Sequence, residues 1–510
     1  MRIEDILPLS PLQGGLLFHA LFDKQAPDVY AAQVVLDLEG PLDSAALHAA
    51  VRALLARHAN LRAAFQHENL TRPVQVIMRQ VEVPWRSIDL SNRDETERQQ
   101  EFEQLLQHER IARFELASPP LMRFVLIKFA PDNHRLVLTY HHMLIDGWSI
   151  PVLVQELFAL YANNRDAGAL PRVRPYRDYL AWVAAQDRDA AIAAWREALA
   201  GLEEGTRVAP PGRARAPAAP KQFMVSLSEE LTAALTRQGR AQGLTLNTFM
   251  QAAWAILLGR LTGRDDVVFG VTVAGRPPEI VGVESMVGLF INTLPLRIKL
   301  APNKPLLAVL RAAQDCQSLL ITHQHLGLAE IQALAGLGEL FDTLVVFENY
   351  PVNKSSFSTG ANGLRLNSAA AHDATHYPLS LMVAPGERLQ LRLDYRGDLF
   401  DRASVAALAD RFIRLLEAAV AEPERAIGSL DILSAAERRT ILREWNDTAH
   451  AVPSAVLPQL FEAQAAKNPD AVAVVSADQN LTYGELDARA NRLAHHLRAL
   501  GVGPETVVGL

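Results

Sequence analysis

Helical and strand-like patterns of apolar residues alternate along most of this 510-residue chain. The first helix is predicted by a capping box, in which Ser10 is the N-cap, Pro11 the first helical residue and Gln13 the third. An apolar face follows at helical spacing: Leu12, Leu16, Leu17, Ala20 and Leu21. Gly14 and Gly15 interrupt this helix at a cost in stability, which indicates a close approach to its backbone.

The same alternation continues through two large regions of the chain. In the first, the pattern predicts strands at 33–38, 75–77, 124–127 and 135–140, and helices over 47–55, 94–110 and 150–161, the last with Ser149 as its N-cap. A helix over 179–199 and a flexible surface connection at 208–220 follow. The second region has a helix over 247–261 and strands at 267–273 and 342–347. This order predicts an α/β class with layered sheets.

The pattern changes near residue 436. Residues 436–453 are polar and typical of a linker, and a new series begins with a helix near 457–461 and a strand at 471–475. A last strand is predicted at 506–510, without the continuation that a complete domain would have. We therefore expect the final fifty or so residues to be the opening of a further domain.

Composition limits the classes of function. The 50 basic and 57 acidic residues give a net charge of -7, and the basic residues are dispersed, so a nucleic-acid partner is not expected. The single Cys316 excludes an intrachain disulfide framework and fits a reducing compartment. No signal peptide and no apolar run of membrane-spanning length is seen. We expect a cytoplasmic protein without a membrane partner.

The clearest candidate for chemistry lies between the strand at 135–140 and the helix after it. His141 and His142 are adjacent, so on a strand they face opposite sides and only one can line a cleft. A histidine titrates near neutral pH, and the helix start brings N–H groups close to it. Asp146, four residues beyond His142, could orient an imidazole or hold the loop through an arginine. A metal site is less favoured, because its ligands would have to converge from one face.

The sequence from His141 to Gly147, His-His-x-x-x-Asp-Gly, resembles the signature of condensation domains in nonribosomal peptide synthetases. Further segments are similar to that family's motifs and occur in its order: residues 10–19, 57–65, 275–277, 286–293 and 347–351. Residues 481–486 and 490–494 resemble the first core motif of an adenylation domain. Each motif alone is weak, but their shared order is specific.

This resemblance implies a fold of two chloramphenicol-acetyltransferase-like lobes that form a V-shaped pseudo-dimer, followed by a partial α/β adenylation-domain start. The implied boundaries are 1–175 for the N-terminal lobe, 176–435 for the C-terminal lobe, 436–457 for a linker and 458–510 for the truncated adenylation fragment. The active site would lie in a tunnel between the lobes, which two phosphopantetheine arms enter from opposite sides.

The resemblance also implies roles for individual residues. His142 carries over as the catalytic histidine, with Gly147 leaving room for substrate and presenting its N–H. His141 carries over as structural, and Asp146 as the salt-bridge partner of Arg276, which favours the loop-holding alternative. The substrate-channel candidates are Ser149, Asn292 and His376. Arg62 and Phe65 are expected to have structural roles. The aromatic residues Phe347, Tyr350 and Tyr377 are expected to pack against one another rather than bind a ligand.

The implied reaction joins a donor peptidyl or aminoacyl thioester to the amine of an acceptor aminoacyl thioester. The expected partners are an upstream donor and a downstream acceptor peptidyl carrier protein and the adenylation domain of the same module, with the chain itself a monomer. No cofactor or metal is expected on this chain, since the phosphopantetheine belongs to the carriers. The motif at Ser10 and the Asp-Gly-Trp-Ser sequence ending at Ser149 favour a donor with a D-residue at its end.

Two alternatives use the same fold. An epimerisation domain shares the histidine motif, but the adenylation-like tail argues against it. A non-catalytic recruitment domain is a binding module, and such domains have typically lost the histidine signature that this chain retains.

Overall fold

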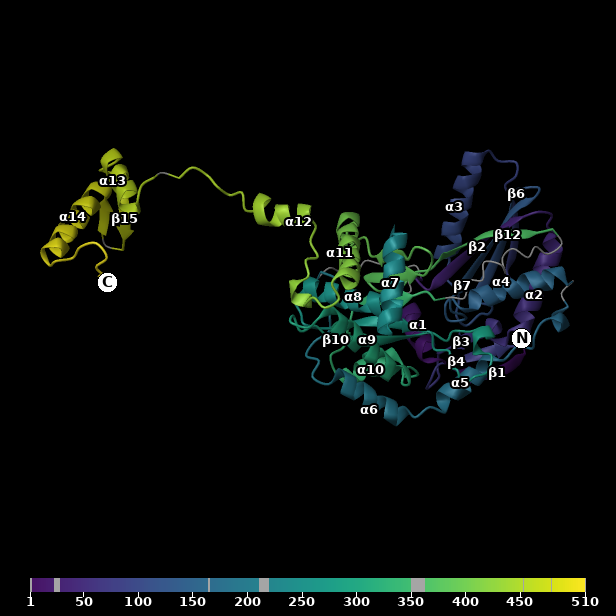
Figure 1. Cartoon of the computed structure of the whole chain (residues 1–510). Coiled ribbons are helices and arrows are strands. Elements are labelled where there is room, and N and C mark those ends of the chain that lie inside the picture. Colours follow the sequence, from purple (N-terminus) through teal and green to yellow (C-terminus); the bar gives the residue numbers. More distant parts are fainter. Residues whose placement is uncertain are drawn as a thin grey trace. The chain divides into compact units, whose positions relative to one another are not determined.

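The computed structural model describes residues 2–22, 28–163, 166–210, 220–349, 363–452, 454–477 and 479–509. Its residues form two compact units, Met1–Ile432 and Leu433–Leu510. The first unit contains two lobes, each built on its own main sheet (Figure 1).

The main sheet of the first lobe has five strands in the order β12-β2-β7-β6-β5. Their bounds are β2 (Ala31–Glu39), β5 (Trp85–Asp89), β6 (Met122–Ala130), β7 (Asn133–His141) and β12 (Arg365–His372). A small antiparallel sheet lies beside it, formed by β1 (Ile3–Pro8), β3 (Ala63–Gln66) and β4 (Val74–Met78). The helices of this lobe are α1 (Pro11–Phe22), α2 (Ser44–Arg57), α3 (Glu95–Ile111) and α4 (Ser149–Ala162).

The two faces of this sheet are covered by different helices. Leu136 and Leu138 of β7 share one apolar cluster with Leu47 of α2 and Leu157 of α4. Val137, which lies between the two leucines, packs on the other side with the α3 phenylalanine Phe102. The alternation of side chains along a strand thus gives both faces a buried core.

One strand of the first sheet comes from far along the chain. Strand β12 pairs antiparallel with β2, with Arg365 opposite Glu39 and His372 opposite Gln33. The sheet of the first lobe therefore includes residues beyond position 175. The segment that follows β12 begins close to the start of β2 because of this register.

The second lobe has a six-stranded sheet in the order β10-β9-β11-β13-β14-β8. Its strands are β8 (Lys221–Ser226), β9 (Asp266–Val273), β10 (Asn292–Lys299), β11 (Thr343–Phe347), β13 (Leu379–Ala384) and β14 (Gln390–Tyr395). Its helices include α7 (Glu229–Gln242), α8 (Leu246–Thr262), α9 (Leu306–Ile321), α10 (Leu328–Ala335) and α11 (Arg402–Ala421). Helix α8 is buried on all sides from Thr248 to Gly259, as expected for a central helix.

The helix predicted over 179–199 is wrong as a single element. The structure has α5 (Tyr176–Ala184) and α6 (Arg188–Leu199), separated at Gln186 and Asp187. The Asp187 carboxylate accepts a hydrogen bond from the Ala190 N–H at 2.9 Å and so caps a new helix. Most of the surface connection predicted at 208–220 lies outside the described residues.

The unit Leu433–Leu510 contains α12 (Ala435–Arg439), a π-helical turn (Thr440–Glu444), α13 (Leu457–Lys467), the hairpin strands β15 (Val472–Ser476) and β16 (Gln479–Thr482), and α14 (Tyr483–Ala499). The polar segment at 436–453 is thus partly helical. The strand predicted at 506–510 is wrong for residues 506–509, which form no strand, and Leu510 lies outside the described residues. A strand needs a partner, and no described residue pairs with these positions. Among the described helices, none has the length and apolar character to cross a membrane.

Candidate functional site

A cavity of about 2300 Å³ is lined by residues of both lobes of the first unit. The first lobe contributes residues of α1, the start of β2 and the turn between β7 and α4. The second lobe contributes residues of α8, α9, β10 and the segment between β12 and β13. This volume is well above the roughly 300–1,000 Å³ of an ordinary small-molecule pocket.

His142 lies on the wall of this cavity, directly after β7. Its backbone N–H donates to the Tyr30 carbonyl at 2.9 Å, and its ring Nδ1 lies 3.4 Å from the Ile145 carbonyl. A carbonyl can only accept, so Nδ1 carries the proton and Nε2 keeps its lone pair in the neutral ring. Burial lowers the pKa of His142 below its usual value, although Asp373 and Asp146 oppose this. His142 is therefore a neutral imidazole with a basic nitrogen at neutral pH.

His141 is fully buried and faces the other way, as alternation along the strand predicts. Its Nε2 lies 3.1 Å from the Asp28 Oδ2, and its Nδ1 accepts from the Met143 N–H at 3.1 Å. Burial alone would raise the pKa of Asp28, but the hydrogen bond and charge of His141 and the Tyr30 N–H lower it. Both ring nitrogens of His141 are thus used inside the protein, and the ring fixes the turn.

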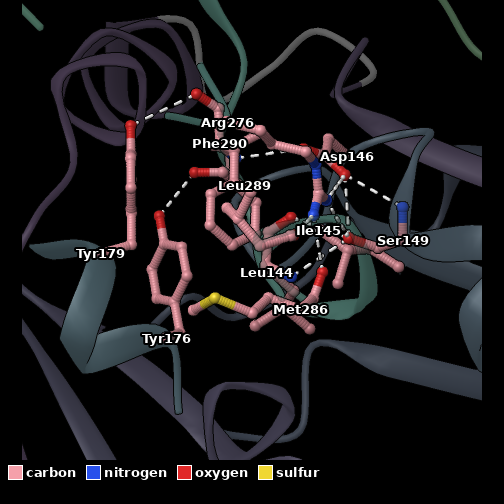
Figure 2. Close-up of polar contacts among 12 residues, drawn as sticks. Leu144, Ile145, Asp146, Ser149, Tyr176, Tyr179, Arg276, Met286, Leu289 and Phe290 are labelled. Carbon is pink, nitrogen blue, oxygen red and sulfur yellow. Dashed lines mark hydrogen bonds and ion pairs between the residues drawn. The ribbon is translucent and has the colours of Figure 1, made fainter. Parts of the chain in front are cut away.

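Asp146 and Arg276 form an ion pair between the turn and the second lobe, as Figure 2 shows. The Arg276 Nη2 donates to Asp146 Oδ1 at 3.0 Å, while Asp146 Oδ2 accepts from the Phe290 N–H at 3.1 Å. Arg276 Nη1 donates to the Met286 carbonyl at 2.9 Å, and its guanidinium lies 4.0 Å from the centre of the Phe290 ring. The resemblance pairs these same two residues.

Ser149 does not line the cavity, which corrects the expectation of a substrate-channel residue. Its side chain is fully buried, and its hydroxyl contacts Asp146 Oδ1 at 2.8 Å (Figure 2). The same hydroxyl lies 2.9 Å from the Gly288 carbonyl. The Gly288 N–H also donates to this hydroxyl at 3.1 Å. Ser149 is not the helix N-cap either: α4 begins at Ser149 itself, and Asp146 accepts the Ser149 N–H at 3.0 Å. Gly147 and Trp148, by contrast, line the cavity.

Asn292 lines the cavity and also holds a loop of the second lobe. Its amide nitrogen donates to the carbonyls of Gln324 at 2.8 Å and Leu326 at 2.9 Å, and its Oδ1 accepts from the Thr293 N–H at 2.9 Å. Both N–H bonds of the amide are therefore used within the protein. The sequence left open whether Asn292 faces the cleft or holds a loop, and the structure shows both.

His376 lies on the cavity wall in the segment between β12 and β13. Its Nδ1 forms a short hydrogen bond with the Tyr30 hydroxyl, and its ring stacks on His19 of α1 with centroids 3.8 Å apart. The sequence motifs point to His376 but not to Tyr30 or His19. No chemical motif surrounds Tyr30, and the contact joins positions 346 residues apart.

Four charged residues near the cavity were also missed. Arg392 pairs with Asp373 at 2.7 Å and with Asp394 at 3.1 Å, and Glu348 lines the same wall. Burial and the repulsion of Asp373 raise the pKa of Glu348 to about 7. Burial raises the pKa of Asp394 to about 6, with Arg392 opposing it. These residues make the wall near His142 acidic.

The remaining candidates are structural or lie outside the described residues. Arg62 is buried and its Nη2 lies 3.1 Å from Glu4, while Phe65 is fully buried. Phe347 and Tyr377 pack against the core of the second lobe and also line the cavity, and Tyr350 lies outside the described residues. Among the described residues, no three His, Cys, Asp or Glu side chains are grouped to hold a metal ion.

Comparisons with known proteins agree with this fold. Residues 3–442 match the family described as Condensation domain, and residues 461–510 match the family described as AMP-binding enzyme. The chain belongs to the condensation-domain family, followed by the start of an AMP-binding domain. Condensation domains of nonribosomal peptide synthetases catalyse amide-bond formation. The predicted α/β class of chloramphenicol-acetyltransferase-like lobes is confirmed.

The chain is 34% identical to bacitracin synthase 3 of Bacillus licheniformis over 518 residues. That alignment covers 100% of this chain but 8% of the relative, so the chain spans less than a tenth of its length. The first condensation domain of the calcium-dependent antibiotic synthetase has the same fold, with a TM-score of 0.69 and 23% identity over 85% of this chain and 100% of that one. The X-domain from teicoplanin biosynthesis, solved in complex with OxyB, gives a TM-score of 0.72 and 25% identity over 85% of this chain and 97% of that one.

Proposed function

We propose that this chain forms a peptide bond between a donor thioester and the amine of an acceptor aminoacyl thioester. The observation that carries the proposal is a large cavity, shared by both lobes, with the basic nitrogen of His142 in its wall. The acceptor amine attacks the thioester carbonyl carbon, the C–N bond forms and the C–S bond breaks. The amine loses one proton, and the thiolate that leaves gains one.

His142 is the proposed catalytic residue, with Nε2 receiving a hydrogen bond or a proton from the attacking amine. A free α-amino group has a pKa near about 8, so part of it is already neutral at pH 7. General-base help typically contributes about 10²–10⁴-fold, and positioning two tethered reactants can contribute more. The cavity therefore acts mainly by positioning, and His142 directs the amine.

Gly147 is proposed to leave room for substrate and to present its N–H to the carbonyl oxygen that gains negative charge. It lines the cavity two residues before α4 begins, where the helix dipole is positive. Asp146 and Arg276 are proposed to hold this turn, with His141 and the buried hydroxyl of Ser149 supporting it.

Two carrier proteins are proposed to deliver the substrates, each on a phosphopantetheine arm. The cavity volume fits more than one small molecule, which supports the simultaneous presence of a donor and an acceptor arm. The carriers hold the phosphopantetheine, and this chain is proposed to bind no cofactor of its own. We also propose that it works as a monomer in the cytoplasm, next to the adenylation domain of the same module.

A carrier-loaded assay tests this function. Donor and acceptor carriers are loaded with aminoacyl groups, and dipeptide on the acceptor carrier is measured by mass spectrometry. His142→Ala is expected to lose about 10²–10⁴-fold in rate. The matched control is His108→Ala, which removes an exposed imidazole from α3, away from the cavity. Equal turnover in wild type and His142→Ala contradicts a chemical role for His142.

The same assay separates the competing functions. Likeness to the X-domain supports a recruitment module as the second candidate, and that candidate predicts no dipeptide from any donor. An epimerase instead inverts the α-carbon of a single carrier-bound residue, which chiral analysis of the released amino acid detects. For the condensation reaction, we propose a donor whose last residue is a D-amino acid. The assay therefore compares donors that end in an L-residue with donors that end in a D-residue. Efficient use of L-ended donors alone contradicts this preference.

A further inference from the structure

Backbone groups of residues 288–290 in the second lobe bond the turn between β7 and α4. The Gly288 carbonyl accepts the Asp146 N–H at 3.0 Å, and the Phe290 N–H donates to Asp146 Oδ2 at 3.1 Å. The Asp146 carbonyl and the Gly147 N–H belong to one planar peptide unit, so bonds that hold Asp146 also restrain the direction of that N–H. This short segment therefore supports the N–H that is proposed to face the reacting carbonyl.

Two tyrosines of α5 bond the other two carbonyls of the same segment. The Tyr176 hydroxyl donates to the Leu289 carbonyl at 2.5 Å, and the Tyr179 hydroxyl donates to the Phe290 carbonyl at 3.3 Å, as Figure 2 shows. A carbonyl can only accept, so both phenols are donors. Each tyrosine is 4% exposed. A carbonyl that loses its phenol would therefore stay buried without a donor, which is costly.

The rings of these tyrosines also pack closely on the segment. A Cβ at Gly288 would meet the Tyr176 ring at 2.3 Å, so this contact requires glycine. The Phe290 ring meets the Tyr176 ring edge-on with centroids 5.2 Å apart, and its centroid lies 4.7 Å from that of Tyr179. These aromatic residues belong to a small buried cluster that is separate from the main cores of the two lobes. Few contacts hold this cluster, so each hydroxyl matters to it.

Helix α5 is also attached to the first lobe. Arg177 Nη1 lies 3.2 Å from Asp5 Oδ2 of β1, and Leu7 of β1 packs against the aromatic cluster. Ser10, at the start of α1, interacts with the Tyr176 phenol. The tyrosines thus link residues 288–290 of the second lobe to the first lobe, which carries the turn.

We propose that Tyr176 and Tyr179 are positioning residues for the reaction: they hold residues 288–290 against the turn and so keep His142 and Gly147 in their reactive positions. The proposal rests on the proposed function and extends it to two residues that do not line the cavity. A purely structural role would lower stability alone, whereas a positioning role also lowers the rate of the folded enzyme.

Hydrogen exchange of the full chain, followed by mass spectrometry, tests the contact without substrate. Tyr176→Phe keeps the ring and removes the hydroxyl, so the peptide that covers residues 142–149 is expected to exchange about tenfold faster. Tyr179→Phe should have a smaller effect, because its bond is longer. Tyr161→Phe is the matched control, since it removes a buried phenol that accepts the Asp43 N–H at 3.0 Å, away from the cavity. Unchanged exchange over 142–149 in both α5 variants overturns the proposal.

The carrier-loaded assay tests the effect on the rate, at a temperature where each variant is folded. Tyr176→Phe is expected to lower kcat about tenfold, the size of effect of one hydrogen bond, with KM for either carrier within about twofold. Tyr161→Phe should keep the wild-type kcat. If Tyr176→Phe does not fold, Tyr179→Phe replaces it, with an expected loss of about threefold. An equal loss of kcat in Tyr161→Phe overturns the proposal.

The pH profile provides a readout that lost stability alone would not change. Burial lowers the pKa of His142, the charges of Asp373 and Asp146 oppose this, and neighbouring His141 adds to it. A loosened turn admits water to the His142 ring, so its pKa rises towards the usual 6.5. The acid limb of Tyr176→Phe should therefore lie at higher pH than that of wild type, and the limb of Tyr161→Phe should not move.

The outcomes separate this proposal from the function on which it rests. A Tyr176→Phe variant with faster exchange but the wild-type kcat and acid limb overturns the positioning role and leaves the proposed function intact. A wild-type chain that forms no peptide overturns the proposed function, while the exchange comparison still shows whether the two phenols hold the turn.

Discussion

Asp146 and Arg276 form an ion pair that is almost completely withdrawn from solvent. The Nη2 and Oδ1 atoms are 3.0 Å apart, and the two side chains are 0% and 4% exposed. The carboxylate also accepts two backbone hydrogen bonds. The Ser149 N–H donates to its Oδ1, and the Phe290 N–H donates to its Oδ2. The pair thus connects the turn after β7 directly to residues 276–290 of the second lobe.

Arg276→Ala should therefore destabilise the first unit strongly. Removal of one partner leaves the Asp146 charge buried and unpaired, which typically costs about 3–5 kcal/mol. Chemical denaturation followed by tryptophan fluorescence measures the free energy of unfolding. Because the chain has two units, the transition of the first is followed separately from that of residues 433–510.

An exposed ion pair provides the control for this prediction. Arg388 and Glu229 are 3.0 Å apart, but their side chains are 58% and 61% exposed. Arg388→Ala should cost less than about 1 kcal/mol, since water replaces the lost partner. Equal effects of Arg276→Ala and Arg388→Ala would mean that the buried pair does not hold the turn.

The rate of peptide formation should fall on the acid side as His142 gains a proton. Burial lowers the pKa of His142 from its usual 6.5, so His142 stays neutral and basic above that pH. The acceptor amine titrates near about pH 8, so each rate is first divided by the neutral fraction of the amine. The corrected rate is expected to be level at neutral pH and to fall as the pH drops through the lowered pKa of His142, below 6.5. Single-turnover rates with carrier-loaded substrates between about pH 5 and 8 measure this acid limb.

A second group titrates nearby and needs its own control. The pKa of Glu348 is raised to about 7, and this residue lines the same cavity. Glu348→Gln should keep the acid limb, whereas the residual activity of His142→Ala should lack it. Loss of the limb in Glu348→Gln alone would assign the titration to the carboxyl group.

The sequence predicted the local features of the site because they depend on short-range rules. Alternation of side chains along a strand is enough to predict that His141 faces the core and His142 faces the cavity. The capping box also forms as its pattern predicts, with reciprocal hydrogen bonds between Ser10 and Gln13. The resemblance added Arg276, which no local rule pairs with Asp146.

Contacts that depend on tertiary pairing could not be predicted from the sequence. Tyr30 and His376 meet because β12 joins the sheet of the other lobe, and no periodicity announces which sheet a strand will join. The acidic wall formed by Asp373 and Glu348 depends on the same pairing. The substrate-channel role of Ser149 was predicted wrongly for a related reason. Its hydroxyl donates to the carbonyl of Gly288, which is 139 residues away in the sequence.

Ser149→Ala should lower stability and leave substrate use nearly unchanged. The buried hydroxyl bonds Asp146 and the Gly288 backbone, so its loss leaves buried polar groups unpaired at a cost of about 1–3 kcal/mol. KM for both carriers should stay within about twofold, since Ser149 does not line the cavity. Denaturation and steady-state assays measure the two effects.

A serine at the surface gives the comparison. The Ser285 hydroxyl donates to the Gly282 carbonyl at 2.9 Å in an exposed turn. Ser285→Ala should change stability by less than about 0.5 kcal/mol, because water can satisfy the carbonyl. A large rise in KM for Ser149→Ala, without loss of stability, would return Ser149 to the substrate channel.

Replacement of Gly14 or Gly15 by alanine should raise the stability of α1 and lower the rate of peptide formation. A Cβ at either position meets nothing within 4 Å, so no close approach inside the chain requires glycine, and alanine should stabilise α1 by up to about 1 kcal/mol. Both glycines line the cavity, where an added methyl group takes space from a substrate arm. We therefore expect a higher Tm and a several-fold lower kcat/KM for each variant. Gln100→Ala, in an exposed position of α3, is the control for helix stabilisation alone and should keep full activity. Full activity of both glycine variants would mean that the arms pass away from α1.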